Sequence, residues 1–185
     1  HGATVGLVGY GASGRAVARR LEGFGVRLLV CDPALESAGA VRTVGLEELL
    51  RRADVASLHL PLSNGTRRLI GEQELALMAP HAVLVNTSRG GLVDEVALAA
   101  QLRSGRLRAA ALDVFEEEPP PLAELAELHN VVLSPHVGGL SELSVARMTE
   151  QATGHVLDVL RGRPELSALA NPEVLERPSR VGDAS

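Results

Sequence analysis

The chain has 185 residues, a length typical of one domain, and it is 45% hydrophobic and 22% charged, as ordinary globular proteins are. All 18 basic residues are arginine, so no lysine is present for a Schiff base or a P-loop, and the single cysteine, Cys31, excludes an internal disulfide and a multi-cysteine zinc site. The net charge of −5 and the scarcity of aromatic residues argue against a nucleic-acid partner, no apolar run reaches the roughly 18 residues of a membrane span, and no metal site is expected.

Short apolar runs alternate with helical patterns along the chain. The expected strands cover residues 3–8, 26–31, 54–60, 82–85, 108–112 and 130–133. The expected helices cover residues 15–21, 46–52, 72–78, about 95–104 and 142–160. Asp94 and Ser141 are the expected N-caps of the last two helices. Continuous apolar strands that alternate with helices predict an α/β fold, a doubly wound parallel sheet with helices on both faces.

A glycine motif directly follows the first expected strand. Gly9, Gly11 and Gly14 fit the pattern G-x-G-x-x-G and open the next helix. In such a motif the first glycine makes the tight turn, the second lets a pyrophosphate approach the backbone, and the third lets helix and strand pack closely. Glycine-rich turns also arise for backbone reasons alone, but the position between strand and helix favours a dinucleotide site in a Rossmann-type fold.

An acidic residue ends the second expected strand. Asp32 lies 18 residues after Gly14, close to the spacing of about 20 at which such folds bind the adenosine ribose through a carboxylate. A carboxylate there repels a 2′-phosphate, so NAD is predicted rather than NADP. The alternative is that Asp32 and Pro33 only form a turn.

Four blocks in the second half of the chain carry a more specific signal. They are HLPL at residues 59–62 with Thr66, NTSRGGLVDE at 86–95, ALDVFEEEP at 111–119 and LSPHVGG at 133–139. They closely resemble the signature segments of the D-isomer-specific 2-hydroxyacid dehydrogenases. The resemblance runs in order from about residue 4 to residue 160.

The resemblance places Arg89, Glu118 and His136 on the catalytic positions of that family. The chemistry fits, because an arginine suits a substrate carboxylate, a histidine can protonate the carbonyl oxygen, and a glutamate can orient the histidine and stabilise its imidazolium. Each residue also has a structural alternative: Arg89 as a surface ion-pair partner, Glu118 as one charge of an acidic loop, and His136 as a turn cap. Their joint position at strand ends favours the catalytic interpretation.

The resemblance also implies further cofactor contacts. Ala12 and Ser13 are expected under the pyrophosphate, Leu60, Pro61 and Thr66 near the adenosine, Thr87 and Ser88 beside the nicotinamide, Asp113 at its carboxamide, and Gly138 and Gly139 after the catalytic histidine. Ser13 departs from the family, which usually carries a bulky aliphatic residue at this position. The serine loses a packing contact but offers a hydroxyl to a phosphate.

The resemblance implies a domain organisation as well. Residues 1–161 are expected to form the NAD-binding domain, with a long helix at 141–161, and residues 162–185 a C-terminal tail. Family members carry a substrate domain before the nucleotide fold. Since only His1 and Gly2 precede the first expected strand, we expect that domain to be absent from this chain, and the chain alone to turn over substrate poorly.

Two functions remain open at this point. The first is hydride transfer between NAD(H) and a small 2-keto or 2-hydroxy acid, by an enzyme that is a homodimer in its full-length form and is cytoplasmic by default. The alternative is a non-catalytic NAD-binding scaffold of the corepressor kind, or a truncated module. A scaffold need not retain Arg89, Glu118 and His136, so these residues favour the enzyme.

Overall fold

The computed structural model describes residues 2–35, 41–120 and 123–176. It divides the chain into two compact units, His1–Gly138 and Gly139–Ser185. The boundary precedes the long helix that the sequence analysis assigns to the NAD-binding domain, so the assignment of residues 139–161 to that domain stays a prediction. The part of the expected tail from residue 177 onward lies outside the described residues.

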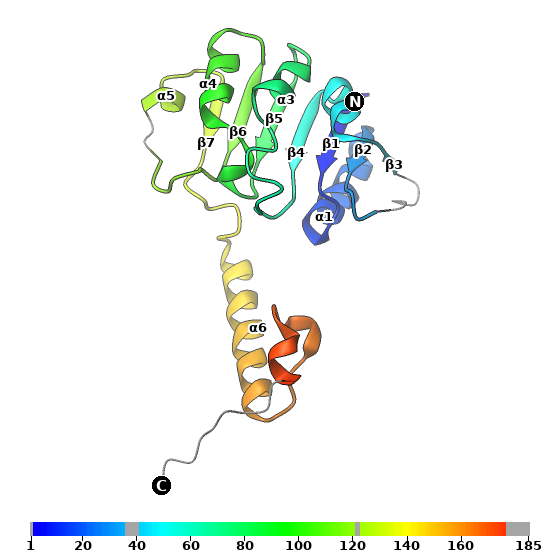
Figure 1. The fold of residues 1–185 in the computed structure, drawn as a ribbon, viewed down its shortest axis with the longest axis vertical. Coiled ribbons are helices and arrows are strands. Elements are labelled where there is room, and N and C mark those ends of the chain that lie inside the picture. The colour runs from blue at the N-terminus through cyan, green and yellow to red at the C-terminus, as the bar shows by residue number, and fades with distance from the viewer. Residues whose placement is uncertain (1, 36–40, 121–122, 177–185) are drawn as a thin grey trace. The chain divides into compact units, whose positions relative to one another are not determined.

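The first unit is built on one parallel sheet with the strand order β3-β2-β1-β4-β5-β6-β7. Figure 1 shows the strands side by side in this order. The strands are β1 Thr4–Val8, β2 Arg27–Cys31, β3 Arg42–Thr43, β4 Val55–Leu58, β5 Val83–Asn86, β6 Ala109–Leu112 and β7 Val131–Leu133. The strand order reverses between β1 and β4, and ligands of such sheets bind at this switch point, at the carboxyl ends of the strands.

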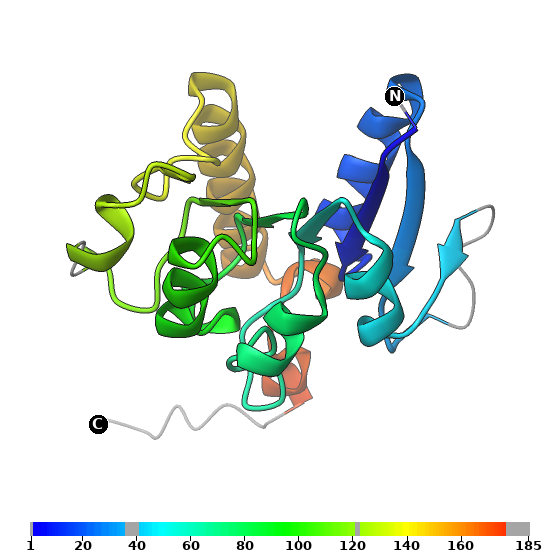
Figure 2. The same ribbon diagram turned by 90° about the horizontal axis from the view of Figure 1, so that it is seen from above.

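Helices cover both faces of the sheet, which confirms the predicted doubly wound architecture. The helices of the first unit are α1 Ala12–Leu21, α2 Leu46–Arg52, α3 Glu72–Leu77, α4 Glu95–Arg103 and α5 Ala123–Ala126. Helix α1 packs over β1 and β2 through Ala18 in one apolar cluster. Leucines of the helices α2 to α5 form a larger cluster with the opposite face, and Figure 2 shows α3 and α4 together on that side.

The structure shifts some of the expected element boundaries. Helix α1 begins at Ala12 rather than at residue 15, because Gly11 serves as its N-cap and the motif itself forms the first turn. Strand β4 ends at Leu58, so that His59 and Leu60 lie in the following loop. The two-residue edge strand β3 and the four-residue helix α5 were not expected, since such short elements show no apolar periodicity.

The carboxyl ends of six strands meet at one edge of the sheet. At this edge a residue of functional interest follows the last residue of each strand: Gly9 after β1, Asp32 after β2, His59 after β4, Thr87 after β5, Asp113 after β6 and Ser134 after β7. The fold therefore gathers side chains that are far apart in the sequence.

The second unit contains the long helix α6, Glu142–Leu160. As predicted, Ser141 is its N-cap, and the Ser141 side chain accepts a hydrogen bond from the backbone N–H of Ser144 at 3.1 Å. Two short 3₁₀ turns follow at Leu166–Ala168 and Pro172–Glu176. In the described part of the chain, no helix is both long enough and apolar enough to cross a membrane.

Candidate functional site

The three glycines of the motif differ in the space around them. Gly9 has a φ of +93°, and a Cβ atom there would lie 2.5 Å from the carbonyl oxygen of His59. A Cβ at Gly14 would lie 2.3 Å from the carbonyl oxygen of Gly9. A Cβ at Gly11 would meet no atom within 4 Å. Gly9 and Gly14 are thus required by the fold, whereas Gly11 only keeps space open beside the helix start.

That open space belongs to a cleft of about 490 Å³, which we call the glycine cleft. Its volume falls in the range of small-molecule sites. No side chain caps the N-terminus of α1, and its first turn carries no acidic residue. The free N–H groups of the first turn and the helix dipole therefore favour an anion such as a pyrophosphate.

Half of the predicted cofactor residues line this glycine cleft. They are Gly11, Ala12, Ser13, Leu60, Pro61, Thr87 and Ser88. Val17, His59 and Arg89 complete the lining. Burial lowers the pKa of His59, whose Nε2 lies 3.0 Å from the hydroxyl of Ser57, so the ring is neutral at physiological pH.

Asp32 ties the glycine turn to the end of β2. Its Oδ2 accepts a hydrogen bond from the N–H of Tyr10 at 2.7 Å, and its Oδ1 accepts one from the N–H of Ala34 at 2.9 Å. Because each carboxylate oxygen can accept two hydrogen bonds, both oxygens retain capacity for hydroxyl groups of a ligand. The turn interpretation of Asp32 and the ribose interpretation are therefore compatible. The neighbouring Cys31 has a raised pKa through burial and the Asp32 charge, so it remains a thiol, as a small strand hydrophobe would.

Thr66 lies outside the lining of the glycine cleft and folds the turn after it. Its hydroxyl donates to the carbonyl of Pro61 at 2.8 Å and accepts the N–H of Ser63 at 2.8 Å. Gly139 belongs to the second unit of the chain. The predicted cofactor contacts of Thr66 and Gly139 stay predictions.

Asp113 holds the loop that carries His136. Its Oδ1 accepts from the hydroxyl of Ser134 at 2.5 Å and from the N–H of Val137 at 3.0 Å, and its Oδ2 accepts from the N–H of Gly138 at 2.8 Å. Burial of Asp113 disfavours its charge, but these hydrogen bonds outweigh burial and keep the pKa of the carboxyl below its ordinary value. A Cβ at Gly138 would lie 2.8 Å from Asp113 Oδ2, so a larger residue there would displace the Asp113 carboxylate.

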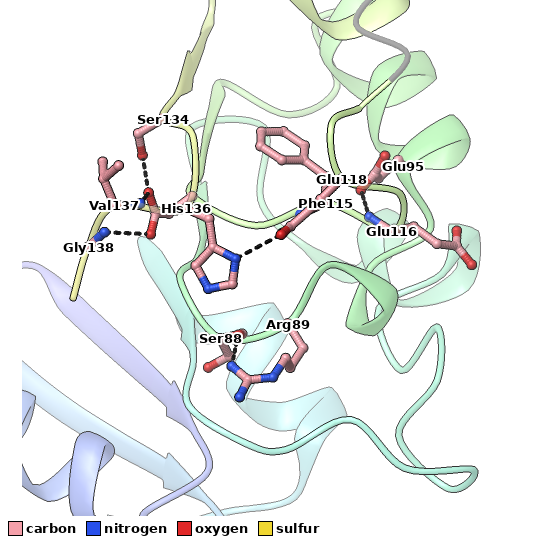
Figure 3. A network of polar contacts seen from close by, with 11 residues as sticks. Ser88, Arg89, Glu95, Phe115, Glu116, Glu118, Ser134, His136, Val137 and Gly138 are labelled. Carbon is pink, nitrogen blue, oxygen red and sulfur yellow. Dashed lines mark hydrogen bonds and ion pairs between the residues drawn. The ribbon is translucent and has the colours of Figure 1, made fainter. Parts of the chain in front are cut away.

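His136 and Glu118 form a direct pair. The Nδ1 atom of His136 lies 2.8 Å from Oε2 of Glu118. Figure 3 shows the imidazole ring directed toward the Glu118 carboxylate. Oε1 of Glu118 accepts the N–H of Phe115 at 3.1 Å. The hydrogen bond with His136, followed by that from Phe115, lowers the pKa of Glu118, which is therefore a carboxylate near neutral pH. His136 itself has a φ of +54°, a left-handed conformation that costs energy in a residue other than glycine and is held here by its flanking bonds.

Arg89 lies below this pair in Figure 3. Its Nη1 donates to the carbonyl of Ser88 at 2.6 Å, and within the described residues no carboxylate lies within ion-pair distance of its guanidinium. This observation disfavours the surface ion-pair interpretation. Four of the five donors of an arginine remain available for a ligand anion.

Arg89, Glu118 and His136 line a second cavity of about 310 Å³, which we call the histidine pocket. Arg89 lines both this pocket and the glycine cleft. The remaining lining comes from Leu62, Arg67, Gly90, Gly91, Val114, Phe115 and Glu116. No role of these residues could be predicted from the sequence, because no spacing rule connects the turn at 62–67 with the segments around residues 90 and 115. Among the described residues, no His, Cys, Asp and Glu side chains are grouped so that they could hold a metal ion.

Comparison with known proteins agrees with this geometry. Residues 1–138 match the family model described as "D-isomer specific 2-hydroxyacid dehydrogenase, NAD binding domain". The chain is 44% identical over 181 residues to a glyoxylate reductase of Korarchaeum cryptofilum, covering 95% of this chain and 54% of that protein. It is 39% identical over 179 residues to a D-3-phosphoglycerate dehydrogenase of Methanocaldococcus jannaschii, covering 94% of this chain and 34% of that protein.

The solved structures agree as well. The NAD-complexed form of a D-isomer specific 2-hydroxyacid dehydrogenase from Lactobacillus delbrueckii subspecies bulgaricus superimposes with a TM-score of 0.84 at 31% identity. The match covers 90% of this chain and 56% of that one. The chain thus spans about half the length of these relatives, or less.

Proposed function

The chain belongs to the family of D-isomer-specific 2-hydroxyacid dehydrogenases, within which it is an NAD-binding domain, and from this premise we propose that it serves the NADH-dependent reduction of a small 2-keto acid to the D-2-hydroxy acid. The reverse oxidation uses the same residues. The catalytic and cofactor roles below are part of this proposal.

The fit of NAD to the glycine cleft rests on the helix start. Gly11 leaves room that a Cβ would occupy, and the uncapped first turn of α1 offers N–H groups to a pyrophosphate. We assign Ala12 and Ser13 to the pyrophosphate and Thr87 and Ser88 to the nicotinamide half, all of which line the cleft. Asp32 is not part of this lining, and we assign it to the ribose hydroxyls of the adenosine because it follows β2 at the same edge of the sheet. A carboxylate at residue 32 disfavours NADP, since it repels a 2′-phosphate.

Asp113 contributes to this cofactor site mainly through the loop that it holds. Three donors already occupy its carboxylate, and the residue is only 5% exposed. One acceptor direction on Oδ2 remains for the carboxamide that the family resemblance assigns to it. The same hydrogen bonds fix the backbone on both sides of His136.

The proposed chemistry divides among three side chains. Arg89 binds the substrate carboxylate and polarises the adjacent carbonyl. When bound, NADH supplies the hydride that reduces the carbonyl carbon. His136 gives the proton to the carbonyl oxygen from Nε2, since Nδ1 faces Glu118. Glu118 remains a carboxylate, holds the ring in place and stabilises the imidazolium before the transfer.

The single observation that carries this proposal is the position of Arg89 between the two cavities. It lines both the glycine cleft and the histidine pocket. A keto acid held by Arg89 therefore lies within reach of His136 on one side and of the cofactor site on the other. A scaffold that only binds NAD has no use for the hydrogen-bonded pair of His136 and Glu118 in the second cavity.

The test is a panel of 2-keto acids with NADH, assayed on the longest natural protein that contains this chain. The panel includes glyoxylate, pyruvate, hydroxypyruvate and phosphohydroxypyruvate. We expect the His136→Ala variant to lose about 100-fold or more in kcat, the usual scale of general acid catalysis, while its Kd for NADH is unchanged. His129→Ala, a change of another exposed histidine, is the matched control. Intact keto-acid reduction by the His136→Ala variant would refute the assignment.

Two further parts of the proposal rest on the family resemblance: a substrate domain outside this chain and a homodimer in the full-length protein. A cytoplasmic location is proposed only as the default. The substrate domain is expected to close the cleft and exclude water from the reaction.

A further inference from the structure

The histidine pocket contains a second cation besides Arg89. Arg67 lies in the turn that follows the HLPL segment and lines the same 310 Å³ cavity as Arg89 and His136. A Cβ placed on Gly91 would lie 3.6 Å from Nη1 of Arg67, so the guanidinium rests against the segment that carries Arg89 two residues earlier. The pocket therefore offers two guanidinium groups to a ligand.

The turn that carries Arg67 is held firmly. The N–H of Arg67 donates to the carbonyl of Ser63 at 2.9 Å, and the N–H of Arg68 donates to the carbonyl of Gly91 at 2.8 Å. The hydroxyl of Thr66 closes the same turn. The backbone position of Arg67 at the pocket is thus fixed, and only its side chain needs to move to meet a ligand.

The present partner of Arg67 is loosely bound. Its Nη1 lies 3.4 Å from Oε1 of Glu116, longer than the 2.7–2.9 Å typical of strong charge-assisted bonds. The Arg67 side chain is 55% exposed, and ion pairs of such exposure contribute little. Arg68 also contacts Glu116, through Oε2 at 3.3 Å. Glu116 therefore keeps a cationic partner when Arg67 turns toward the cavity.

We propose that Arg67 binds a second anionic group of the substrate, which makes the substrate class a 2-keto acid with a further carboxylate, sulfonate or phosphate beyond its carbonyl. The inference rests on the proposed function, in which Arg89 binds the first carboxylate. With Arg89 alone, one anionic group of a substrate is neutralised. With both arginines, a dianionic substrate meets one guanidinium at each end, while the carboxylates of Glu116 and Glu118 stay paired with Arg68 and His136.

The experiment compares matched substrate pairs that differ only in the second anionic group. The pairs are pyruvate with 3-sulfopyruvate, and hydroxypyruvate with phosphohydroxypyruvate. They are assayed with NADH on the longest natural protein that contains this chain, as wild type, Arg67→Gln and Arg68→Gln. Arg68 is the matched control, because it shares Glu116 with Arg67 but is not part of the pocket lining.

We expect the wild type to prefer the dianionic member of each pair. Arg67→Gln should lose about tenfold in kcat/KM for the dianionic members, mostly through KM, and less than about twofold for the others, as expected for a charge-assisted contact made in both ground and transition states. Arg68→Gln should change the ratio of the kcat/KM values of the two members of a pair by less than about twofold. The Kd for NADH stays unchanged in both variants, which shows that they are folded.

Two results would overturn the inference without touching the proposed function. One is a wild type that reduces the simple keto acids better than their dianionic counterparts. The other is an Arg67→Gln variant that affects both members of a pair equally, or not at all. If the wild type reduces no 2-keto acid of either kind, the proposed function itself fails and the inference falls with it.

Discussion

Gly11 and Gly14 stand three residues apart and serve opposite needs. At Gly14 the helix α1 approaches the turn so closely that a Cβ would lie 2.3 Å from the backbone oxygen of Gly9. A Cβ at Gly11 would meet no atom of the protein within 4 Å. Gly14 is therefore required by the fold, whereas Gly11 is required only by the proposed ligand.

This difference gives a prediction at the residue scale. Gly14→Ala should lower the free energy of unfolding by about 1–3 kcal/mol, because overpacking against a fixed backbone forces a shift. Gly11→Ala should cost about 1 kcal/mol or less, the penalty of alanine at an N-cap, but weaken NADH binding about tenfold or more by filling the space for the pyrophosphate. Chemical denaturation and NADH titration measure the two effects.

Gly23→Ala is the control, since a Cβ there also meets no atom within 4 Å and the residue lies outside both cavities. It should leave NADH binding unchanged. An unaltered Kd in the Gly11→Ala variant would show that the pyrophosphate does not approach this residue.

The sequence could predict the site only in part at this scale. The spacing of Gly9, Gly11 and Gly14 predicts the motif. It does not show which glycine packs against the backbone and which leaves space for the proposed ligand. Arg67 carries no sequence signal at all. Its place in the histidine pocket follows from the bond between Arg68 and Gly91, which joins two turns that no spacing rule connects.

At the scale of elements, the loop of residues 134–138 is stabilised by a residue of another segment. Asp113, at the end of β6, accepts hydrogen bonds from Ser134, Val137 and Gly138 of this loop. The loop in turn holds His136 in its left-handed conformation. One buried carboxylate thus connects the end of one strand to the loop that follows the next.

Replacement of this carboxylate by an amide should free the loop. In Asp113→Asn one oxygen becomes an N–H donor that faces another donor, so we expect a loss of about 1–3 kcal/mol in the free energy of unfolding. The amides of Val137 and Gly138 should exchange hydrogen faster, as measured by hydrogen–deuterium exchange with mass spectrometry. Unchanged exchange at these amides would contradict the role of Asp113.

The same group predicts an acid dependence of stability. The pKa of Asp113 is lower in the folded protein than in the unfolded chain, so the unfolded state binds more protons in acid. The stabilisation is complete above the ordinary aspartate pKa of about 3.9 and is lost as the pH falls through the lower folded value. Asp113→Asn should lose this part of the acid dependence.

Elements differed in how well the sequence predicted them. Strands with continuous apolar runs, such as β1 and β5, and the long helix α6 with its Ser141 cap, carried strong local signals. Strand β3 and helix α5 are too short to show a period. Helix α1 begins three residues before the predicted start, because glycines of the motif are poor helix formers and only the N-cap geometry of Gly11 shows that the helix has begun.

At the scale of the whole molecule, the chain contains an NAD-binding unit and a helical unit. The residues that line the glycine cleft and the histidine pocket all lie in His1–Gly138. A chain that ends at Leu140 keeps all of them.

We expect this shortened chain to bind NADH with a Kd within about twofold of the 185-residue chain, as measured by calorimetry. Both should reduce glyoxylate slowly, because half of the proposed cleft, which excludes water and fixes the keto acid, lies outside them. A Kd more than about tenfold weaker in the shortened chain would show that residues 141–185 contribute to the cofactor site. Rapid steady-state turnover by the 185-residue chain would refute the need for a second domain.

The position of Arg89 in the lining of both cavities has a thermodynamic consequence. A ligand in either cavity restricts the same guanidinium, so the conformational entropy of ordering it is lost once and not twice. The second ligand then binds to a side chain that is already in place. Linkage makes this cooperativity reciprocal, so under the proposed function the keto acid should tighten the binding of the dinucleotide by the same factor by which the dinucleotide tightens the binding of the keto acid.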